Sequence, residues 1–196
     1  MKKLKKVNYI ITGGLGFIGS NIAKKLIKKN NTGKCIIIDN YTSYINPLRW
    51  NYIDYRKLRF TNIKDKNLRK KIKNKIIFER GDCSDFKTVY TIIEKYEPKI
   101  IFHTAAVPIA KIENPNANEF RKGSIDTTIN ILDCVDLLQK KNKINLKRFI
   151  YISSSMIYGD FTKKTVKEKD EPRPKEIYGT MKLAGESIVK GFSKFT

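Results

Sequence analysis

The chain is poor in the side chains that bind metals or form disulfides, with one His and three Cys among 196 residues. The single histidine, His103, ends an apolar stretch and has no partner histidine, so we interpret it as structural and expect no metal site. The cysteines show neither C-x-x-C spacing nor an even count. Buried thiols in a reducing compartment are therefore expected.

Acidic residues are also scarce, since 19 Asp and Glu stand against 41 Lys and Arg, which gives a net charge of +22. Such an excess raises the hypothesis of nucleic-acid binding. However, the lysines are spread along the whole chain, and Ile and Asn are abundant as well, which indicates compositional bias. Residues 69–75 form the one dense basic cluster. We therefore expect no nucleic-acid partner, and a positive field that helps to capture a phosphorylated substrate.

No apolar run reaches the length of a membrane span. The N-terminal sequence MKKLKKVNYII places basic residues before apolar ones, but the apolar part is short and has no small-residue cleavage site. We therefore expect a cytoplasmic protein without a membrane partner. With 196 residues, of which 40% are hydrophobic, the chain is long enough for one substantial core and short for two domains.

The stretch VNYIITGGLGFIGSN, residues 7–21, predicts a buried strand, a tight turn and a helix. Gly14, Gly16 and Gly19 satisfy the pattern G-x-G-x-x-G, and the cluster can also be phased one residue earlier from Gly13. Such a loop lets the backbone approach a pyrophosphate and points the first N–H groups of the helix at it. A second apolar strand ends at Asp39, where a ribose-binding carboxylate is required. The pattern predicts dinucleotide binding.

Strand-like and helix-like segments alternate along the chain. Short apolar runs predict strands at residues 7–11, 36–39, 75–79, 99–103 and 148–153. Amphipathic segments predict helices at residues 18–27, 85–96, 117–141 and 178–195, with Asp85 as an N-cap. Residues 40–73 have poor periodicity and predict a loop with one or two short helices. This alternation predicts an α/β fold, a doubly wound parallel sheet of order 3-2-1-4-5 with helices on both faces and a ligand crevice at its carboxyl edge.

A second group of polar residues follows the fifth predicted strand. Ser153, Ser154 and Ser155 end this strand, and Tyr178 and Lys182 come later at i and i+4 spacing. On a helix that spacing places both side chains on one face. A nearby ammonium lowers the pKa of a tyrosine, which then acts as a general base. A serine hydroxyl at the strand end can bind the same substrate oxygen.

Together these motifs resemble the extended short-chain dehydrogenase/reductases, and within them the NAD-dependent epimerase/dehydratase family that acts on nucleotide sugars. The motifs that carry the resemblance are TGGLGFIG at 12–19, DN at 39–40, GD at 81–82, HTAA at 103–106, SSSMIYG at 153–159 and YGTMKLAGE at 178–186. The resemblance implies a Rossmann domain, NAD as cofactor and a nucleotide-diphosphate sugar as substrate. It also implies a homodimer in which the helices at 117–141 and 178–195 pair.

The resemblance further implies roles for single residues. It implies cofactor contacts by Gly13, Gly16, Phe17, Ile18, Gly19, Asp39, Asn40, Asp82, Cys83, Ala105, Ala106, Ser153, Tyr178 and Lys182. It implies catalysis by Ser154, with Ser155 as the adjacent option, by Tyr178 as base and by Lys182. A carboxylate at Asp39 repels a 2′-phosphate and Asn40 supplies no compensating cation, so NAD is expected over NADP.

The activity implied is 4-epimerisation by transient oxidation at the sugar C4. Decarboxylation, reduction and dehydration are alternatives, and dehydration is disfavoured because Ser155 and Met156 stand where the 4,6-dehydratases have Asp-Glu. Ser124 stands where the family has an asparagine near the cofactor. We expect residues 1–196 to be a Rossmann domain that is incomplete at its C-terminus and lacks the substrate lobe. A non-catalytic NAD-binding module is the second hypothesis.

Overall fold

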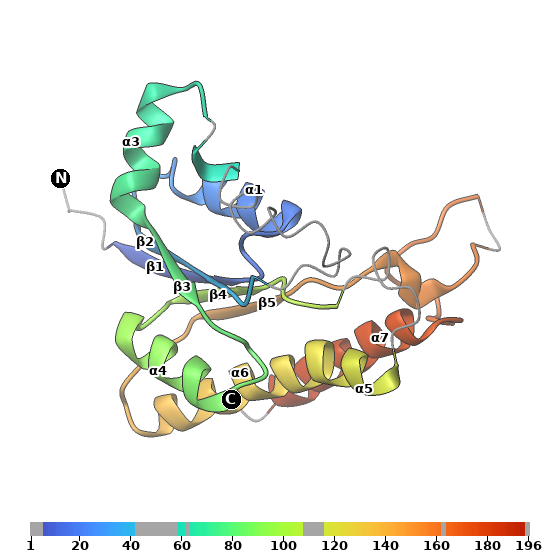
Figure 1. Ribbon diagram of the computed structural model, residues 1–196. Coiled ribbons are helices and arrows are strands. Elements are labelled where there is room, and N and C mark those ends of the chain that lie inside the picture. Colours follow the sequence, from blue (N-terminus) through green and yellow to red (C-terminus); the bar gives the residue numbers. More distant parts are fainter. Residues whose placement is uncertain (1–5, 42–58, 62, 108–115, 162–163, 195–196) are drawn as a thin grey trace.

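The computed structural model describes residues 6–41, 59–61, 63–107, 116–161 and 164–194. Their centre is a five-stranded parallel sheet of order β3-β2-β1-β4-β5 (Figure 1). The strands are β1 (Val7–Thr12), β2 (Thr32–Asp39), β3 (Ile76–Arg80), β4 (Ile100–His103) and β5 (Arg148–Tyr151). The predicted fold class and strand order are confirmed.

Helices cover both faces of the sheet. They are α1 (Phe17–Leu26), α3 (Lys66–Lys75), α4 (Phe86–Tyr96), α5 (Ala117–Phe120), α6 (Thr127–Lys140) and α7 (Ile177–Phe192), with a π-helical segment (Arg121–Asp126) and a 3-10 helix (Ser155–Tyr158). Figure 1 shows α1 and α3 on one face and α4 to α7 on the other. The predicted N-cap of α4 is confirmed, because the Asp85 carboxylate accepts a hydrogen bond from the Lys87 N–H at 3.2 Å.

The sheet is buried on both sides, and this explains why its central strands are almost continuously apolar. Neighbouring side chains of a strand point to opposite faces. Accordingly, Ile10 and Ile36 belong to the core under α4 and α6, whereas Ile11 and Ile37 belong to the core under α1 and α3. All four side chains are at most 1% exposed. The carboxyl edge of the sheet is thereby held rigidly between two cores.

Some elements differ from the prediction. The helix expected over 117–141 is divided into α5, the π-helical segment and α6. Strand β5 ends at Tyr151 instead of residue 153, because Ser154 caps the following 3-10 helix by accepting a hydrogen bond from the Met156 N–H at 3.2 Å. The part of the predicted loop at residues 42–58 lies outside the described residues. Within the described ranges, no helix is both long and apolar enough to cross a membrane.

Candidate dinucleotide and catalytic site

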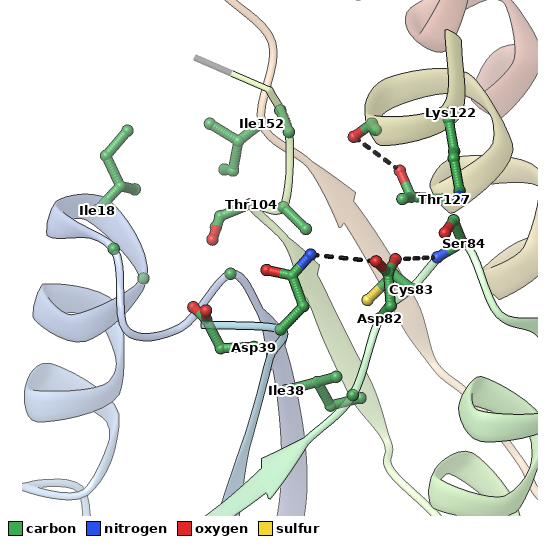
Figure 2. A pocket seen from close by; sticks show the side chains of 18 of the residues that line it. Ile18, Ile38, Asp39, Asp82, Cys83, Ser84, Thr104, Lys122, Thr127 and Ile152 are labelled. Carbon is green, nitrogen blue, oxygen red and sulfur yellow. Dashed lines mark hydrogen bonds between the residues drawn. The ribbon is translucent and has the colours of Figure 1, made fainter. Parts of the chain in front are cut away.

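A pocket of about 520 Å³ opens at the carboxyl edge of the sheet (Figure 2). It is lined by the glycine loop after β1, by the segments that follow β2, β3, β4 and β5, and by helix α7. The structure brings together here all the residues predicted to contact the cofactor, which are Gly13, Gly16, Phe17, Ile18, Gly19, Asp39, Asn40, Asp82, Cys83, Ala105, Ala106, Ser153, Tyr178 and Lys182.

The glycine loop forms one wall of the pocket. Gly13 has φ +62°, and a Cβ there would lie 2.9 Å from the backbone of Ala105. A Cβ on Gly19 would lie 2.7 Å from the Cα of Gly14, so the loop and the helix pack in direct backbone contact. Helix α1 begins after Gly16 with no side-chain cap and no acidic residue in its first turn. The positive end of α1 therefore faces the pocket and suits an anionic ligand.

Asp39 holds this loop from the end of β2. One carboxylate oxygen accepts a hydrogen bond from the Leu15 N–H at 3.1 Å, and the other accepts from the Tyr41 N–H at 3.0 Å. The residue is only 6% exposed. Asp39 is therefore both a wall of the pocket and a support for the glycine loop.

Asp82 occupies the far side of the pocket, after β3. Figure 2 shows its carboxylate between the Asn40 amide, at 3.2 Å, and the Ser84 N–H, at 2.8 Å. Burial raises the pKa of Asp82, but the hydrogen bonds from Ser84 and Asn40 and the positive charge of Lys122 outweigh it, so the pKa lies below its ordinary value. Asp82 is therefore an ionised acceptor at neutral pH.

Ser154 and Tyr178 meet where β5 and α7 approach the pocket. Their side chains are hydrogen bonded to each other. Burial raises the pKa of Tyr178, and the hydrogen bond with Ser154 only partly opposes this rise. The prediction that a nearby ammonium lowers the pKa of Tyr178 is therefore wrong for this structure. Lys182 does not shift the phenol, because its ammonium is directed at other groups.

Lys182 is 3% exposed, on the same face of α7 as Tyr178. Its Nζ donates to the Ile152 carbonyl at 2.8 Å and lies 4.9 Å from the centroid of the Tyr151 ring. Burial lowers its pKa to about 8. The nearby Ser153 hydroxyl is buried and has no hydrogen-bond partner among the described residues. The Lys182 ammonium and the unsatisfied Ser153 hydroxyl thus both belong to residues that line the pocket.

The family model for GDP-mannose 4,6 dehydratase matches residues 10–195. The chain belongs to this family. Its glycine loop, the carboxylate after β2 and the Tyr178–Lys182 pair all lie within the matched residues.

Relatives in the family include both 4-epimerases and 4,6-dehydratases. The chain is 30% identical to a putative UDP-glucose 4-epimerase of Methanocaldococcus jannaschii, over 94% of this chain and 50% of that protein. It is 29% identical to a dTDP-D-glucose 4,6-dehydratase of Dictyostelium discoideum, over 94% of this chain and 40% of that protein. The chain thus spans about half the length of the curated relatives it matches.

Solved structures show the same fold. The UDP-glucuronic acid 4-epimerase of Bacillus cereus, solved with UDP-glucuronic acid and NAD, superposes with a TM-score of 0.73 at 22% identity, over 95% of this chain and 52% of that one. This likeness agrees with the parallel sheet and its strand order.

Two basic residues outside the predicted site also lie at the pocket. Arg59 and Lys122 both line the pocket, and sequence analysis missed both. Nothing in the sequence distinguishes Arg59 and Lys122 from the other residues among the 41 Lys and Arg. Their places at the pocket depend on how distant segments approach β2 and β3. Ser124 lies in the π-helical segment, 2% exposed and outside the residues that line the pocket.

The remaining predictions concern His103, the metal-binding side chains and the cysteines. His103 lies buried between the Thr12 hydroxyl, at 2.7 Å from Nδ1, and the Thr128 hydroxyl, at 3.1 Å from Nε2. It is therefore a structural residue, as predicted. Among the described residues no group of His, Cys, Asp and Glu could hold a metal ion. The free, buried thiols are Cys35, Cys83 and Cys134, and burial raises the pKa of each.

Proposed function

We propose that the chain is the NAD-binding Rossmann domain, residues 1–196, of a nucleotide-sugar 4-epimerase. One observation carries this proposal. The uncapped glycine loop at the start of α1 and the Tyr178–Lys182 face of α7 line a single pocket, and Ser154 is hydrogen bonded to Tyr178 beside it. A dinucleotide site and a proton-transfer pair in one pocket are what an alcohol oxidation requires.

The described residues fit a dinucleotide. Gly13 allows the loop to lie in backbone contact with Ala105, which any side chain would prevent, and the buried Ser153 hydroxyl has no hydrogen-bond partner among the described residues. We assign the pyrophosphate to the loop, the adenosine ribose to Asp39, the adenine to the Asp82 side and the nicotinamide half to the end of β5. The lining residues occur in this order around the pocket wall, from β3 and β2 through β1 to β5.

NAD, when bound, supplies a hydride acceptor and donor for the carbon that bears the reacting hydroxyl. Tyr178 takes the hydroxyl proton as the alcohol becomes a ketone and returns it on reduction. Ser154 hydrogen bonds the same oxygen and orients it. Lys182, whose Nζ donates to the Ile152 carbonyl, would hold the cofactor ribose with its remaining N–H donors. In support, Tyr178 and Lys182 line the pocket and Ser154 lies beside Tyr178.

One sequence feature supports 4-epimerisation over dehydration, since the relatives, a putative 4-epimerase at 30% identity and a 4,6-dehydratase at 29%, do not separate the two activities. Ser155 and Met156 offer no carboxylate in the 3-10 helix beside Ser154, where the 4,6-dehydratases resembled by the sequence have an acidic pair. Without that acid, loss of water from the sugar has no proton donor at this position.

We further propose a homodimer through α6 and α7, which lie against each other in Figure 1. Ile129 and Leu137 on α6 are 37% and 40% exposed, an apolar surface that a second copy would cover. Sedimentation equilibrium at micromolar concentration tests this, and a single species of monomer mass would contradict it.

The test of function separates binding from chemistry. Tyr178→Phe removes the base but keeps the ring, so we expect NAD affinity within about threefold of wild type and turnover of UDP-sugars lowered at least about 100-fold. Titration calorimetry with NAD and a coupled assay with UDP-glucose and UDP-glucuronic acid measure the two effects. Tyr90→Phe on α4, outside the pocket lining, is the matched control and should change neither.

Loss of NAD binding in Tyr178→Phe would show that these roles are wrongly assigned. Tight NAD binding without turnover of any UDP-sugar or dTDP-sugar by the wild-type chain would favour the second hypothesis, a non-catalytic NAD-binding module.

A further inference from the structure

Arg59 is a cation in the pocket that the proposed function leaves without a role. It lies in a helical segment at residues 59–61 and lines the pocket together with Asp39 and Asn40. Its Nη1 donates a hydrogen bond to the carbonyl of Leu15 at 2.5 Å. Leu15 is the fully buried residue at the centre of the glycine loop. Arg59 is therefore fixed to the loop that is assigned to the pyrophosphate.

Two charged groups hold Leu15 from opposite ends. Its N–H donates to the Asp39 carboxylate at 3.1 Å, and its carbonyl accepts from the Arg59 guanidinium at 2.5 Å. The carboxylate and the guanidinium therefore contact the backbone of the same residue, and both line the pocket. The acid after the second strand faces the adenosine ribose in such folds, and Arg59 is a cation that lines the same pocket.

We propose that Arg59 allows this site to accept a 2′-phosphorylated dinucleotide, NADP, as well as NAD. The proposal rests on the dinucleotide binding proposed above. From the sequence, Asp39 was expected to exclude a 2′-phosphate because Asn40 supplies no compensating cation. The structure supplies that cation from Arg59 instead. An arginine near this acid is the group that accommodates a 2′-phosphate in related folds.

The geometry suits a phosphate at this corner. A guanidinium has five N–H donors in a planar fork, and the contact with Leu15 uses one of them. Both oxygens of Asp39 accept backbone N–H groups, from Leu15 and Tyr41, and these bonds balance part of the carboxylate charge. The repulsion that a 2′-phosphate would meet is thereby reduced, and the other N–H donors of Arg59 would attract it.

Titration of the whole chain with NAD and with NADP tests the proposal. We expect both to bind, NADP more weakly, and Arg59→Leu to lower NADP affinity at least about tenfold while NAD affinity changes less than about threefold. Arg59→Lys keeps the charge but loses the fork, and should fall between the two. Arg69→Leu, an exposed position on α3 outside the pocket lining, is the matched control and should change neither affinity.

Three results would overturn the proposal. Wild-type chain that binds NAD but not NADP would show that Asp39 excludes the phosphate, and would leave NAD binding standing. Equal loss of NAD and NADP affinity in Arg59→Leu would assign Arg59 only to holding the loop. Failure of the wild-type chain to bind either dinucleotide would overturn this proposal together with the cofactor assignment.

Discussion

Gly13 shows how one missing methyl group shapes the pocket. Its φ of +62° is unfavourable for any side chain. A Cβ there would also lie 2.9 Å from both the amide nitrogen and the Cα of Ala105, and backbone atoms cannot move aside as a flexible side chain can. The approach of the β1 and β4 loops, and hence the pocket wall between them, depends on glycine at this position.

Gly13→Ala should therefore lower the free energy of unfolding by about 2 kcal/mol or more, from the strained backbone and the overlap together. NAD affinity should fall with it, because the loop moves. Urea unfolding and calorimetry measure the two effects. Gly191→Ala on α7 is the matched control, since a Cβ there meets nothing within 4 Å. It should raise stability by up to about 1 kcal/mol. Wild-type stability in Gly13→Ala would contradict the argument.

Side-chain hydrogen bonds support the π-helical segment. Its wide turn frees carbonyls that an α-helix would use. The Thr127 hydroxyl donates to the Gly123 carbonyl at 3.3 Å, and the Thr128 hydroxyl donates to the Ser124 carbonyl at 2.7 Å. Lys122 and Gly123 of this segment line the pocket, as does Thr127, the first residue of α6. The wide turn thus positions part of the pocket wall.

Thr128→Val tests this support with almost no change of shape. Thr128 is fully buried, and the substitution leaves the Ser124 carbonyl and His103 Nε2 without this partner. We expect the free energy of unfolding to fall by about 1–3 kcal/mol in urea titrations. Thr91→Val removes a similar hydroxyl, bonded to Lys87, from the exposed face of α4. That control should stay within about 0.5 kcal/mol of wild type. Equal effects of the two substitutions would contradict the role of burial.

At the scale of the whole molecule, His103 links three layers. It lies on β4, contacts Thr12 of β1 and Thr128 of α6, and is fully buried near Lys182. Burial, and then the charge of Lys182, lower its pKa to about 3 from an ordinary value of 6.5. Because the chain has one histidine, its global stability between pH 5 and 7 depends on this group more than on any other.

The sign of the pH effect follows from this shift. Above pH 6.5 His103 is neutral in both the folded and the unfolded chain, so its contribution to stability is complete. As the pH falls below 6.5, the unfolded chain binds a proton that the folded chain excludes, and stability falls by up to about 1.4 kcal/mol per pH unit. Urea titrations from pH 7 to 5 should show this slope. His103→Gln should lose the slope, even with lower stability overall. The same slope in this variant would contradict the prediction.

The pocket was largely predictable because its residues follow the carboxyl ends of strands. Asp39, Asp82, Ala105 and Ser153 lie far apart in the chain, yet a parallel sheet brings all such ends to one edge. Apolar periodicity and turn residues are local properties, so they can be recognised without tertiary structure. The strand order was accordingly predicted from the sequence, and the residues predicted to contact the cofactor all line the pocket.

The sequence alone determined the strands, the glycine turn and the residues at the carboxyl edge, because short-range periodicity and backbone freedom decide them. Only the tertiary structure decided the place of Arg59 beside Leu15, the direction of Lys182 toward Ile152 and the raised pKa of Tyr178. These depend on burial and on contacts between segments far apart in the chain. Neither burial nor contacts between distant segments can be predicted from the order of neighbouring residues.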